Sequence, residues 1–447
     1  MFFQILKIIV RIAVGFYYRR TYVKGMENIP MDRPVLLASN HPNAFMDAIV
    51  LTLFFPRRVF SLARSDVFDT AVKRKVMRYF RIMPVYRIQD GADQLYKNTE
   101  IFEKCHTLLN QKSGILIFPE GICIQERRLR KLRKGLARIA FGSMEVADFK
   151  MDLCIVPVGI NYTKPARHGG DLFLNIDAPI EVESYLDQYN TDKIRTINKL
   201  TADVEKAMSK LIVVIEDFKD DELVGQLESL LENDPKLFGD NKLNPVEKDF
   251  IISRKITHGL SDFKKNSPTG FQELKLKVRE FFAILNLQGF KLELLNRAIL
   301  DKSIISLIVP KLFFAIATLP IFMVGSILNY IPYRFPFLLT KKIVKSNVEF
   351  FSSINLTIGT LIFIFYYLLI SVLTVVLFNS SFVPLLLIAG PFTGKFALYY
   401  RNKLVQIVAL YKMKNEHELA GKLIKNKNDI VEKIENLIHS MEKEKVY

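Results

Sequence analysis

The chain has 447 residues, half of them hydrophobic, which is enough for more than one domain and a large buried core. Its 63 Lys and Arg exceed 46 Asp and Glu by 17 charges, so we expect an anionic partner such as a membrane surface or a phosphorylated substrate, and no nucleic-acid-binding motif accompanies this charge. The three cysteines lack metal-ligand spacing, and their odd number argues against a disulfide framework and fits a reducing compartment.

Residues 1–22 predict an amphipathic helix. Gln4, Lys7 and Arg11 recur at intervals of three and four residues and therefore share one face of a helix. The remaining faces are apolar: Phe2, Phe3, Ile5, Ile8, Ile9, Ile12 and Phe16. This pattern favours an interfacial helix on a membrane, with the basic residues toward the headgroups. A helix packed on its own domain is the alternative.

Residues 23–182 alternate strand-like and helix-like segments. Short apolar runs predict strands at 34–39, 114–121, 153–162 and 171–180. Helical spacing of apolar residues predicts helices at 44–55 and 92–110. Strands separated by helices are typical of an α/β domain with a parallel or mixed sheet flanked by helices.

Two further changes of composition follow. Residues 183–302 are charged and predict a helical insertion, in which we expect no chemistry. Residues 303–400 contain two uncharged runs, 312–333 and 350–394. Since one membrane span needs about 20 apolar residues, we interpret them as two membrane hairpins that enter from the cytoplasmic side. A very apolar soluble helical domain is the alternative, and residues 401–447 predict a charged helical tail.

The stretch NHPNAFMD, residues 40–47, places a histidine after a strand and an aspartate in the next helix. Positions six apart lie about 120° apart on one straight helix, so His41 and Asp47 meet only if His41 lies in the preceding loop. Pro42 stops the helix from starting earlier, and Asn43 can cap it. Asp47 would then bind one ring nitrogen while the other takes a proton from a hydroxyl. On its own, a His-x5-Asp pair is usually without function.

Four sequence blocks occur together and in order. They are NHPNAFMD (40–47), RIMPVYR (81–87), IFPEG (117–121) and IVPVGINY (155–162), with VKGMENIP (23–30) as a lead-in. This arrangement resembles the glycerolipid (phosphate) acyltransferase family, which includes the 1-acylglycerol-3-phosphate and glycerol-3-phosphate acyltransferases. The resemblance covers residues 23 to about 180.

The resemblance implies a role for several residues. His41 matches the family's catalytic base, Asp47 its orienting carboxylate and Arg87 a residue for the acceptor phosphate. The third block is assigned to acceptor binding and comprises Phe118, Pro119, Glu120 and Gly121. The implied chemistry is direct transfer, in which the acceptor hydroxyl attacks the thioester of acyl-CoA or acyl carrier protein. The resemblance implies no metal and no cofactor besides this co-substrate.

The sequence departs from the family pattern in two places. Five residues separate His41 from Asp47, where the usual spacing is four, and Met46 stands at the usual aspartate position. A branch related to glycerol-3-phosphate and dihydroxyacetone-phosphate acyltransferases has a similar form. Ile122 and Cys123 follow Gly121, where the family has a small hydroxyl residue and an arginine.

The segment RRLRKLRK, residues 127–134, carries six basic residues in eight. As a helix it would place Arg127, Arg130, Lys131, Lys134 and Arg138 on one face and the leucines on the other. That face would meet lipid headgroups, acyl-CoA phosphates or the acceptor phosphate. A solvated basic face is the alternative. KGLAR (134–138) also resembles a family element, which favours Lys134 and Arg138 as substrate-binding residues.

These features predict a membrane-bound O-acyltransferase of phospholipid synthesis with its active domain on the cytoplasmic face. The acceptor is of the glycerol-phosphate type: glycerol-3-phosphate, dihydroxyacetone phosphate or lysophosphatidic acid. A CoA-independent lipid-remodelling transacylase and a non-catalytic membrane lipid-binding protein are the alternatives. Membrane lipids are expected partners, and the oligomeric state is left open.

Overall fold

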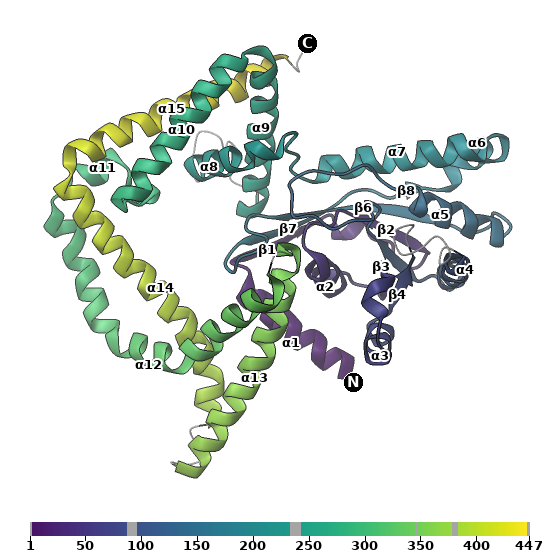
Figure 1. Ribbon diagram of the computed structural model, residues 1–447, viewed down its shortest axis with the longest axis horizontal. Coiled ribbons are helices and arrows are strands. Elements are labelled where there is room, and N and C mark those ends of the chain that lie inside the picture. Colours follow the sequence, from purple (N-terminus) through teal and green to yellow (C-terminus); the bar gives the residue numbers. More distant parts are fainter. Residues whose placement is uncertain (1, 87–95, 233–242, 346, 378–382, 445–447) are drawn as a thin grey trace. The chain divides into compact units, whose positions relative to one another are not determined.

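The computed structural model describes residues 2–86, 96–232, 243–345, 347–377 and 383–444 (Figure 1). The chain forms two compact units. Unit 1 comprises Met1–Glu216, Asn244–Phe250 and Ser346–Ser353. Unit 2 comprises Asp217–Leu243, Ile251–Lys345 and Ile354–Tyr447.

Unit 1 is built on a mixed sheet, which confirms the predicted α/β class. Among the described residues the sheet has eight strands in the order β1-β7-β6-β2-β5-β3-β4, and β8 pairs with β6. Strands β6, β2, β5, β3 and β4 are mutually parallel, whereas β7 runs antiparallel to β6. The strands are β1 (Arg20–Lys24), β2 (Val35–Ser39), β3 (Val59–Arg64), β4 (Ile82–Val85), β5 (Gly114–Ile117), β6 (Cys154–Tyr162), β7 (Asp171–Ile176) and β8 (Ile180–Glu181).

The helices of unit 1 connect these strands. They are α1 (Phe2–Tyr17), α2 (Ala44–Phe54), α3 (Ala71–Tyr79), α4 (Lys97–Asn110), α5 (Gly135–Val146), α6 (Leu186–Thr191) and α7 (Lys193–Leu211). Every residue of β2 is buried, because side chains alternate between the two faces of a strand and both faces of this strand are covered. Leu36 and Ala38 of β2 share one core cluster with residues of α4, α5 and α7.

Helix α7 belongs to this core, so unit 1 extends beyond the predicted boundary at residue 182. Leu200, Val204 and Met208 are fully buried in the cluster that contains Leu36. The end of α7 approaches β6 closely, since a Cβ atom on Gly159 would lie 2.3 Å from the carbonyl oxygen of Leu211. The helical pattern of residues 193–211 was predicted, but its apolar face covers the sheet and does not belong to a separate insertion.

The N-terminal helix α1 is followed directly by a strand. β1 starts at Arg20, so the sheet begins before the predicted boundary at residue 23. Val14 and Tyr17 of α1 are buried within unit 1. Ile5, Ile8, Ile12 and Phe16 form an exposed apolar stripe. Helix α1 therefore packs on its own unit with one side and leaves an apolar side uncovered.

The polar region of unit 2 is helical, as predicted. Its helices are α8 (Asp221–Leu231), α9 (Pro245–Asn266), α10 (Pro268–Gln288), α11 (Arg297–Leu300) and α15 (His417–Glu444), and α9 begins in unit 1. Asp220, at the start of α8, is buried and accepts from Lys264 at 2.7 Å and from Lys275 at 2.5 Å. These ion pairs tie α8 to α9 and α10.

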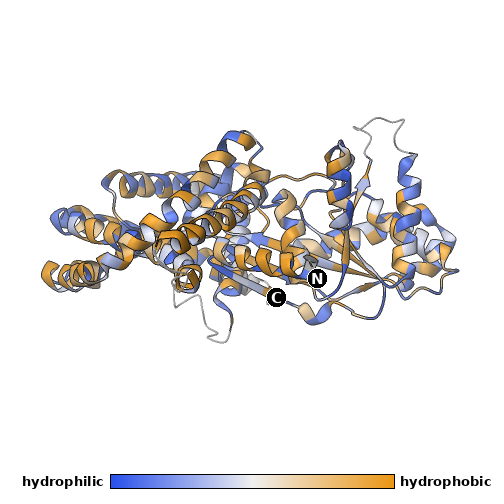
Figure 2. Ribbon diagram, turned by 90° about the horizontal axis from the view of Figure 1, so that it is seen from below, coloured by the Kyte–Doolittle hydropathy of each residue, from blue (hydrophilic) through white to orange (hydrophobic). Residues whose placement is uncertain are grey.

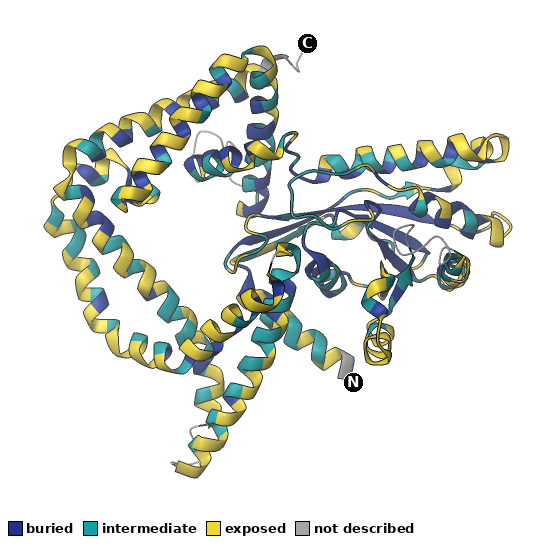
Figure 3. Ribbon diagram, viewed as in Figure 1, coloured by how far each residue is buried: buried dark blue, intermediate teal, exposed yellow. Residues whose placement is uncertain are grey.

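Three described helices are long and apolar enough to cross a membrane: α12 (Ile304–Val344), α13 (Phe351–Leu377) and α14 (Val383–Asn415). Figure 2 shows hydrophobic stretches along some of the long helices, and Figure 3 shows large exposed stretches on α12 and α13, in contrast to the buried strands. The expected turn of the second hairpin, at 378–381, lies outside the described residues. The run 350–394 does supply two helices.

The first predicted hairpin is wrong, because α12 is one continuous helix of 41 residues. It contains Pro310, Pro320, Pro332 and Pro336, and it bends along its length (Figure 1). Proline removes one backbone hydrogen bond and kinks a helix, but a long apolar helix tolerates it when neighbouring helices compensate. The prolines therefore bend this segment without breaking it.

Small and polar residues join α12, α13 and α14. Asn329 donates to the carbonyl oxygens of Gly325 at 2.9 Å and Gly390 at 3.0 Å, and it accepts from the Tyr367 hydroxyl at 2.8 Å. A Cβ atom on Gly390 would lie 2.5 Å from the Tyr367 ring. Close approach at glycines and hydrogen bonds between side chain and backbone are typical of helix packing in membranes.

The position of α7 in the core of unit 1 predicts a large effect of Leu200→Ala. Removal of this fully buried side chain leaves a cavity and should lower the free energy of unfolding by about 2–5 kcal/mol. Ile194→Ala, on the same helix but 73% exposed, should change it by about 0.5 kcal/mol or less. Thermal unfolding in detergent, followed by circular dichroism, measures both. Equal effects of the two substitutions would contradict the assignment of α7 to the core.

Candidate active site

Three neighbouring strands end at one edge of the sheet and carry the candidate residues there. β2 ends at Ser39, β5 at Ile117 and β6 at Tyr162, and both β5 and β6 run parallel to β2. The carboxyl edge of a parallel sheet is where α/β folds place their sites. Three of the four sequence blocks therefore meet at this edge. β4, which lies within the second block, is parallel to them as well.

His41 and Asp47 are in contact, as the sequence predicted. His41 lies in the loop between β2 and α2, and its Nδ1 is 2.9 Å from Asp47 Oδ2. Because a carboxylate only accepts hydrogen bonds, Nδ1 carries a proton and Nε2 has the free lone pair. The His41 side chain is 20% exposed, whereas Asp47 is fully buried. His41 can thus exchange a proton with a substrate through Nε2.

Asp47 has two further donors. Its Oδ2 accepts from the backbone N–H of Asn43 at 2.7 Å, and its Oδ1 accepts from the Tyr162 hydroxyl at 2.8 Å. Burial, followed by the nearby Asp47 charge, raises the pKa of Tyr162, so its hydroxyl remains a donor. Three hydrogen bonds compensate the burial of this carboxylate.

Helix α2 starts in an unusual conformation beside these residues. Asn43 is at the N-cap position, but its side chain does not cap the helix and donates instead to Pro165 O at 2.9 Å, which corrects our expectation. Ala44 has a φ of 40°, and its N–H is 3.0 Å from Cys123 Sγ. Burial raises the pKa of Cys123 to about 12, so it remains a thiol. Strained backbone is common at functional sites, where surrounding contacts hold it.

Phe118 forms one wall of the site. Its ring stacks on the His41 imidazole with centroids 3.9 Å apart and an angle of 13° between the planes. The stack restricts rotation of the imidazole, and it complements the in-plane hydrogen bond to Asp47. Phe118 therefore contacts the candidate base directly.

Glu120 connects two loops. It is 7% exposed, and its two oxygens accept from the backbone N–H groups of His41 and Arg130, each at 3.0 Å. Burial raises the pKa of Glu120, although both hydrogen bonds and the charges of His41 and Arg130 favour ionisation. Glu120 thus positions the His41 loop. Its implied contact with the acceptor stays a prediction.

The segment after Gly121 is irregular, so the helix predicted for 127–134 is wrong. Gly121 has a φ of 68°, and α5 begins only at Gly135. The backbone N–H of Leu132 donates to Glu205 on α7 at 3.0 Å, and that of Arg133 donates to Pro119 O at 2.7 Å. Acceptors from other regions of unit 1 therefore replace helical hydrogen bonds in this segment.

The basic candidates are exposed or lie outside the described residues. Arg87 lies outside the described residues. Lys134 precedes α5, Arg138 lies in its first turn, and both are exposed. Arg133 is the basic side chain that the structure ties to the third block, because a Cβ atom on Gly121 would lie 3.3 Å from its Cγ. Its side chain is exposed as well.

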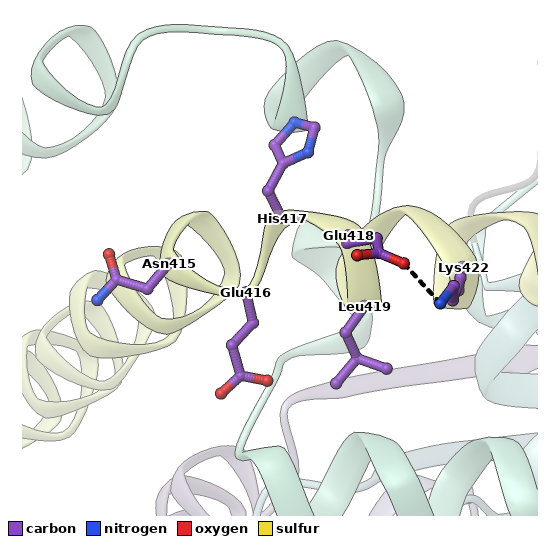
Figure 4. Close-up of a pocket in the computed structure, with 6 residues that line it drawn as sticks. All are labelled: Asn415, Glu416, His417, Glu418, Leu419 and Lys422. Atoms are coloured by element: carbon purple, nitrogen blue, oxygen red, sulfur yellow. Dashed lines mark ion pairs between the residues drawn. The ribbon is translucent and has the colours of Figure 1, made fainter.

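Two cavities lie elsewhere in the chain. One of about 330 Å³, at the turn between α14 and α15, is lined by Asn415, Glu416, His417, Glu418, Leu419 and Lys422 (Figure 4). In Figure 4 Glu418 forms an ion pair with Lys422 of the next turn, and its oxygen and Nζ are 2.7 Å apart. A second cavity of about 460 Å³ lies between α12, α13 and α14. Neither cavity contains a residue of the candidate site. Among the described residues, no cluster of His, Cys, Asp and Glu could bind a metal ion.

Sequence reasoning missed three contributors to the site. Tyr162 ends the fourth block, and the parallel arrangement of its strand beside β2 could have indicated that it lies near His41. Asn40 exchanges two hydrogen bonds with the backbone of Ile160, at 3.0 and 2.7 Å, and this pairing left no signal beyond its place in the first block. Cys123 was considered for metal spacing and as a departure from the family pattern, but not as a partner of the Ala44 backbone.

Comparisons with known proteins bear on this region of the chain. Residues 20–161 match the family model described as Acyltransferase. A segment of 169 residues is 27% identical to glycerol-3-phosphate O-acyltransferase 2 of Saccharomyces cerevisiae, and it covers 37% of this chain and 22% of the yeast protein. The chain therefore spans about a fifth of that relative's length.

A solved structure is also similar, that of the 1-acyl-sn-glycerophosphate acyltransferase PlsC from Thermotoga maritima. It matches 46% of this chain and 78% of that chain, with 17% identity and a TM-score of 0.33. The family match itself contains His41, Asp47, the third block and most of the fourth. It confirms the predicted family resemblance for residues 20–161.

The two backbone contacts of Glu120 predict that Glu120→Gln destabilises the protein. Glutamine has one acceptor oxygen, so its amide NH₂ would face one of the two N–H donors. The free energy of unfolding should fall by about 1–3 kcal/mol. Glu126→Gln is the control, because Glu126 lies in the same segment and pairs with Arg128 and Arg130 near the surface, where a pair contributes about 1 kcal/mol or less. Thermal unfolding with equal losses for both variants would contradict the bridging role.

Proposed function

We propose that this chain, whose residues 20–161 form an acyltransferase domain, is a membrane-bound O-acyltransferase. It transfers a fatty acyl group from acyl-CoA or acyl carrier protein to a glycerol-phosphate-type acceptor: glycerol-3-phosphate, dihydroxyacetone phosphate or lysophosphatidic acid. The observation that carries the proposal is the 2.9 Å contact between His41 Nδ1 and Asp47 within the matched segment. The name of the matched yeast protein supports this class of acceptor.

The proposed mechanism has two proton transfers at His41. Nε2 accepts the proton of the acceptor hydroxyl while the hydroxyl oxygen attacks the carbonyl carbon of the thioester. The tetrahedral intermediate then collapses, the carbon–sulfur bond breaks, and Nε2 returns the proton to the leaving sulfur. The products are an ester and a free thiol, and His41 is neutral again. The transfer requires no metal, no further cofactor and no covalent acyl-enzyme.

The neighbours of His41 support this proton transfer. The Asp47 carboxylate stabilises the imidazolium that forms when Nε2 takes the proton, and the Tyr162 hydroxyl keeps that carboxylate in place. Phe118 stacks against the ring, and Glu120 holds the backbone of the loop. The imidazole therefore has one orientation when the hydroxyl arrives, which is the pre-organisation that catalysis needs.

The acceptor phosphate requires cations near His41. We assign it to Arg133 together with Arg87, Lys134 and Arg138. Arg133 is supported by its contacts with Pro119 and Gly121, which adjoin Phe118 and Glu120. Its guanidinium presents paired N–H donors that match two phosphate oxygens.

The ends of α12 support a specific arrangement in the membrane. The described residues 347–353, which follow α12, belong to unit 1, where the Phe350 ring contacts the Phe45 ring at 5.7 Å and Ser352 accepts from the Tyr17 hydroxyl at 3.0 Å. Before α12, the described residues between 217 and 303 include no helix long and apolar enough to cross. Both ends of α12 are therefore on the same side of the membrane as unit 1. We infer that α12, which stays one bent helix, does not cross to the far side of the membrane, while α13 and α14 cross.

The charges around these helices support a cytoplasmic active domain. Lys341, Lys342 and Lys345 directly precede the segment that belongs to unit 1. A second basic group comprises Arg401 and Lys403 in the second half of α14 and Lys412 and Lys414 in its last turn, where a chain that has crossed twice returns to the same side. Because basic residues stay on the cytoplasmic side of membranes, both groups assign unit 1 to that side.

The base role predicts that His41→Ala lowers the rate of acyl transfer by about 10²–10⁴-fold, because general-base assistance contributes that much. His168→Ala is the control, since His168 is exposed in the same unit and its Nε2 is bonded to Phe16 O at 2.8 Å. Purified protein in detergent, with labelled acyl-CoA and each acceptor in turn, gives the rates. Transfer from a phospholipid without any thioester would indicate a transacylase. No transfer with any donor, and no change in His41→Ala, would leave only a lipid-binding role.

The phosphate role of Arg133 predicts that Arg133→Ala raises the KM for a phosphorylated acceptor by about 10–100-fold, because a hydrogen bond to a charged group contributes about 1.5–3 kcal/mol. The KM for the acyl donor should change much less. Arg133→Lys should recover some of the loss, and Arg195→Ala, an exposed arginine on α7, should have no effect. Equal changes in both KM values would count against this role.

A further inference from the structure

Helix α3 is a surface helix without a core-facing side. None of its residues, Ala71–Tyr79, is buried, and Met77 is the one that is partly covered. The helix is nevertheless well defined at its start, because the Thr70 side chain accepts from the backbone N–H of Lys73 at 3.2 Å. It follows β3, whose end lies at the same edge of the sheet as His41. A helix in this position normally covers a sheet, so its exposure requires another explanation.

The exposed residues of α3 include an apolar stripe. Val72 is 73% exposed, Val76 43%, Tyr79 46% and Phe80, which follows the helix, 40%. At about 100° per residue these four side chains fall within an arc of roughly 100°. The stripe has the width of a face that a helix normally buries, yet each of its four side chains is at least 40% exposed.

Cations border this stripe. Lys73, Arg74, Lys75 and Arg78 are all exposed. Lys73 pairs with Asp69 at 2.9 Å, and Arg74 donates to Phe68 O at 3.1 Å, so these two also support the start of the helix. Lys75 and Arg78 have no ion pair with any described residue. An apolar stripe between cations is typical of helices that lie in the headgroup region of anionic membranes.

We propose that α3 is an interfacial helix that inserts Val72, Val76, Tyr79 and Phe80 into the headgroup region of an anionic bilayer. Lys75 and Arg78 contact the lipid phosphates, and the long stems of both side chains extend over the edge of the stripe. A protein partner fits less well, because lysine is depleted in the cores of protein interfaces. The inference rests on the membrane association proposed above.

This contact would act on substrate delivery. β3 ends at the sheet edge that carries His41 and leads into α3, so contact of α3 with a bilayer would hold this unit on the membrane from which an acyl-chain-bearing substrate comes. Substrates that reside in the membrane should depend on α3 more than water-soluble ones do.

The chain contains no tryptophan, so a single introduced tryptophan reports its own surroundings. Val72→Trp and Val76→Trp probe the stripe. Ile194→Trp is the matched control, because Ile194 is a β-branched helical residue of unit 1 with the same 73% exposure as Val72. The full chain of each variant is reconstituted in vesicles of phosphatidylcholine with phosphatidylglycerol, with and without brominated acyl chains, and floated after a carbonate wash.

We expect the tryptophans at 72 and 76 to emit at shorter wavelength and to lose most of their fluorescence to brominated lipid, whereas the tryptophan at 194 should do neither. Lys75→Glu with Arg78→Glu, or vesicles of phosphatidylcholine alone, should reduce the quenching. A chain that floats while the stripe emits as in water would overturn the α3 inference alone. Blue-shifted emission without quenching would indicate a protein contact and overturn it as well. A chain that fails to float would overturn both this inference and the proposed membrane association.

Discussion

The site depends on one buried carboxylate. Asp47 is fully buried, and an isolated charge in such a place costs several kcal/mol unless it is hydrogen-bonded. Three donors from three different places compensate it: the His41 ring from the loop after β2, the Asn43 backbone before α2, and the Tyr162 hydroxyl at the end of β6. The charge can be accommodated only when the sheet has formed and has brought β2 and β6 together. The geometry of the His41–Asp47 pair is therefore a consequence of the fold.

Glu120 has a similar role at the end of the neighbouring strand. Its oxygens bind the backbone of the His41 loop and of the segment after Gly121, so the ends of β2 and β5 are joined as well. Two buried acidic residues thus organise two irregular segments that have no regular hydrogen bonds of their own. An unpaired buried backbone group costs about 1–3 kcal/mol, and each carboxylate oxygen removes such a cost. The same arrangement places the Phe118 ring against the imidazole.

The sequence predicted what depends on local spacing and missed what depends on distant partners. The contact between His41 and Asp47 was predictable, because six residues separate them and Pro42 limits where the helix starts. Tyr162 was missed because it is 115 residues from Asp47. The basic segment 127–134 has a helical pattern, but Glu205 on α7 and Pro119 bind its N–H groups and prevent the helix.

The prolines of α12 suggested a turn, yet a proline in an apolar helix bends the chain more often than it ends it. The strands β1, β3 and β4 were missed as well. β1, with the sequence RTYVK, lacks the apolar run that marked the others, whereas β4, with the sequence IMPV, is apolar but has only four residues, one of them a proline.

The first residues of α13, which belong to unit 1, connect this helix with the His41–Asp47 pair. The carbonyl oxygen of Pro165 accepts from the Asn43 side chain and also from the Ser352 hydroxyl, and Ser352 in turn accepts from Tyr17 of α1. Asn43 donates its backbone N–H to Asp47. A short chain of hydrogen bonds therefore runs from α1 and from the first residues of α13 to the carboxylate that orients His41. Helix α1 exposes an apolar stripe and α13 is long enough to cross a bilayer, so the two elements that would meet the membrane are also those that hold the start of α2 in place. The contacts of α1 and of the first residues of α13 thus help to hold Asn43 and Asp47 in place, and through Asp47 they help to orient the ring of His41.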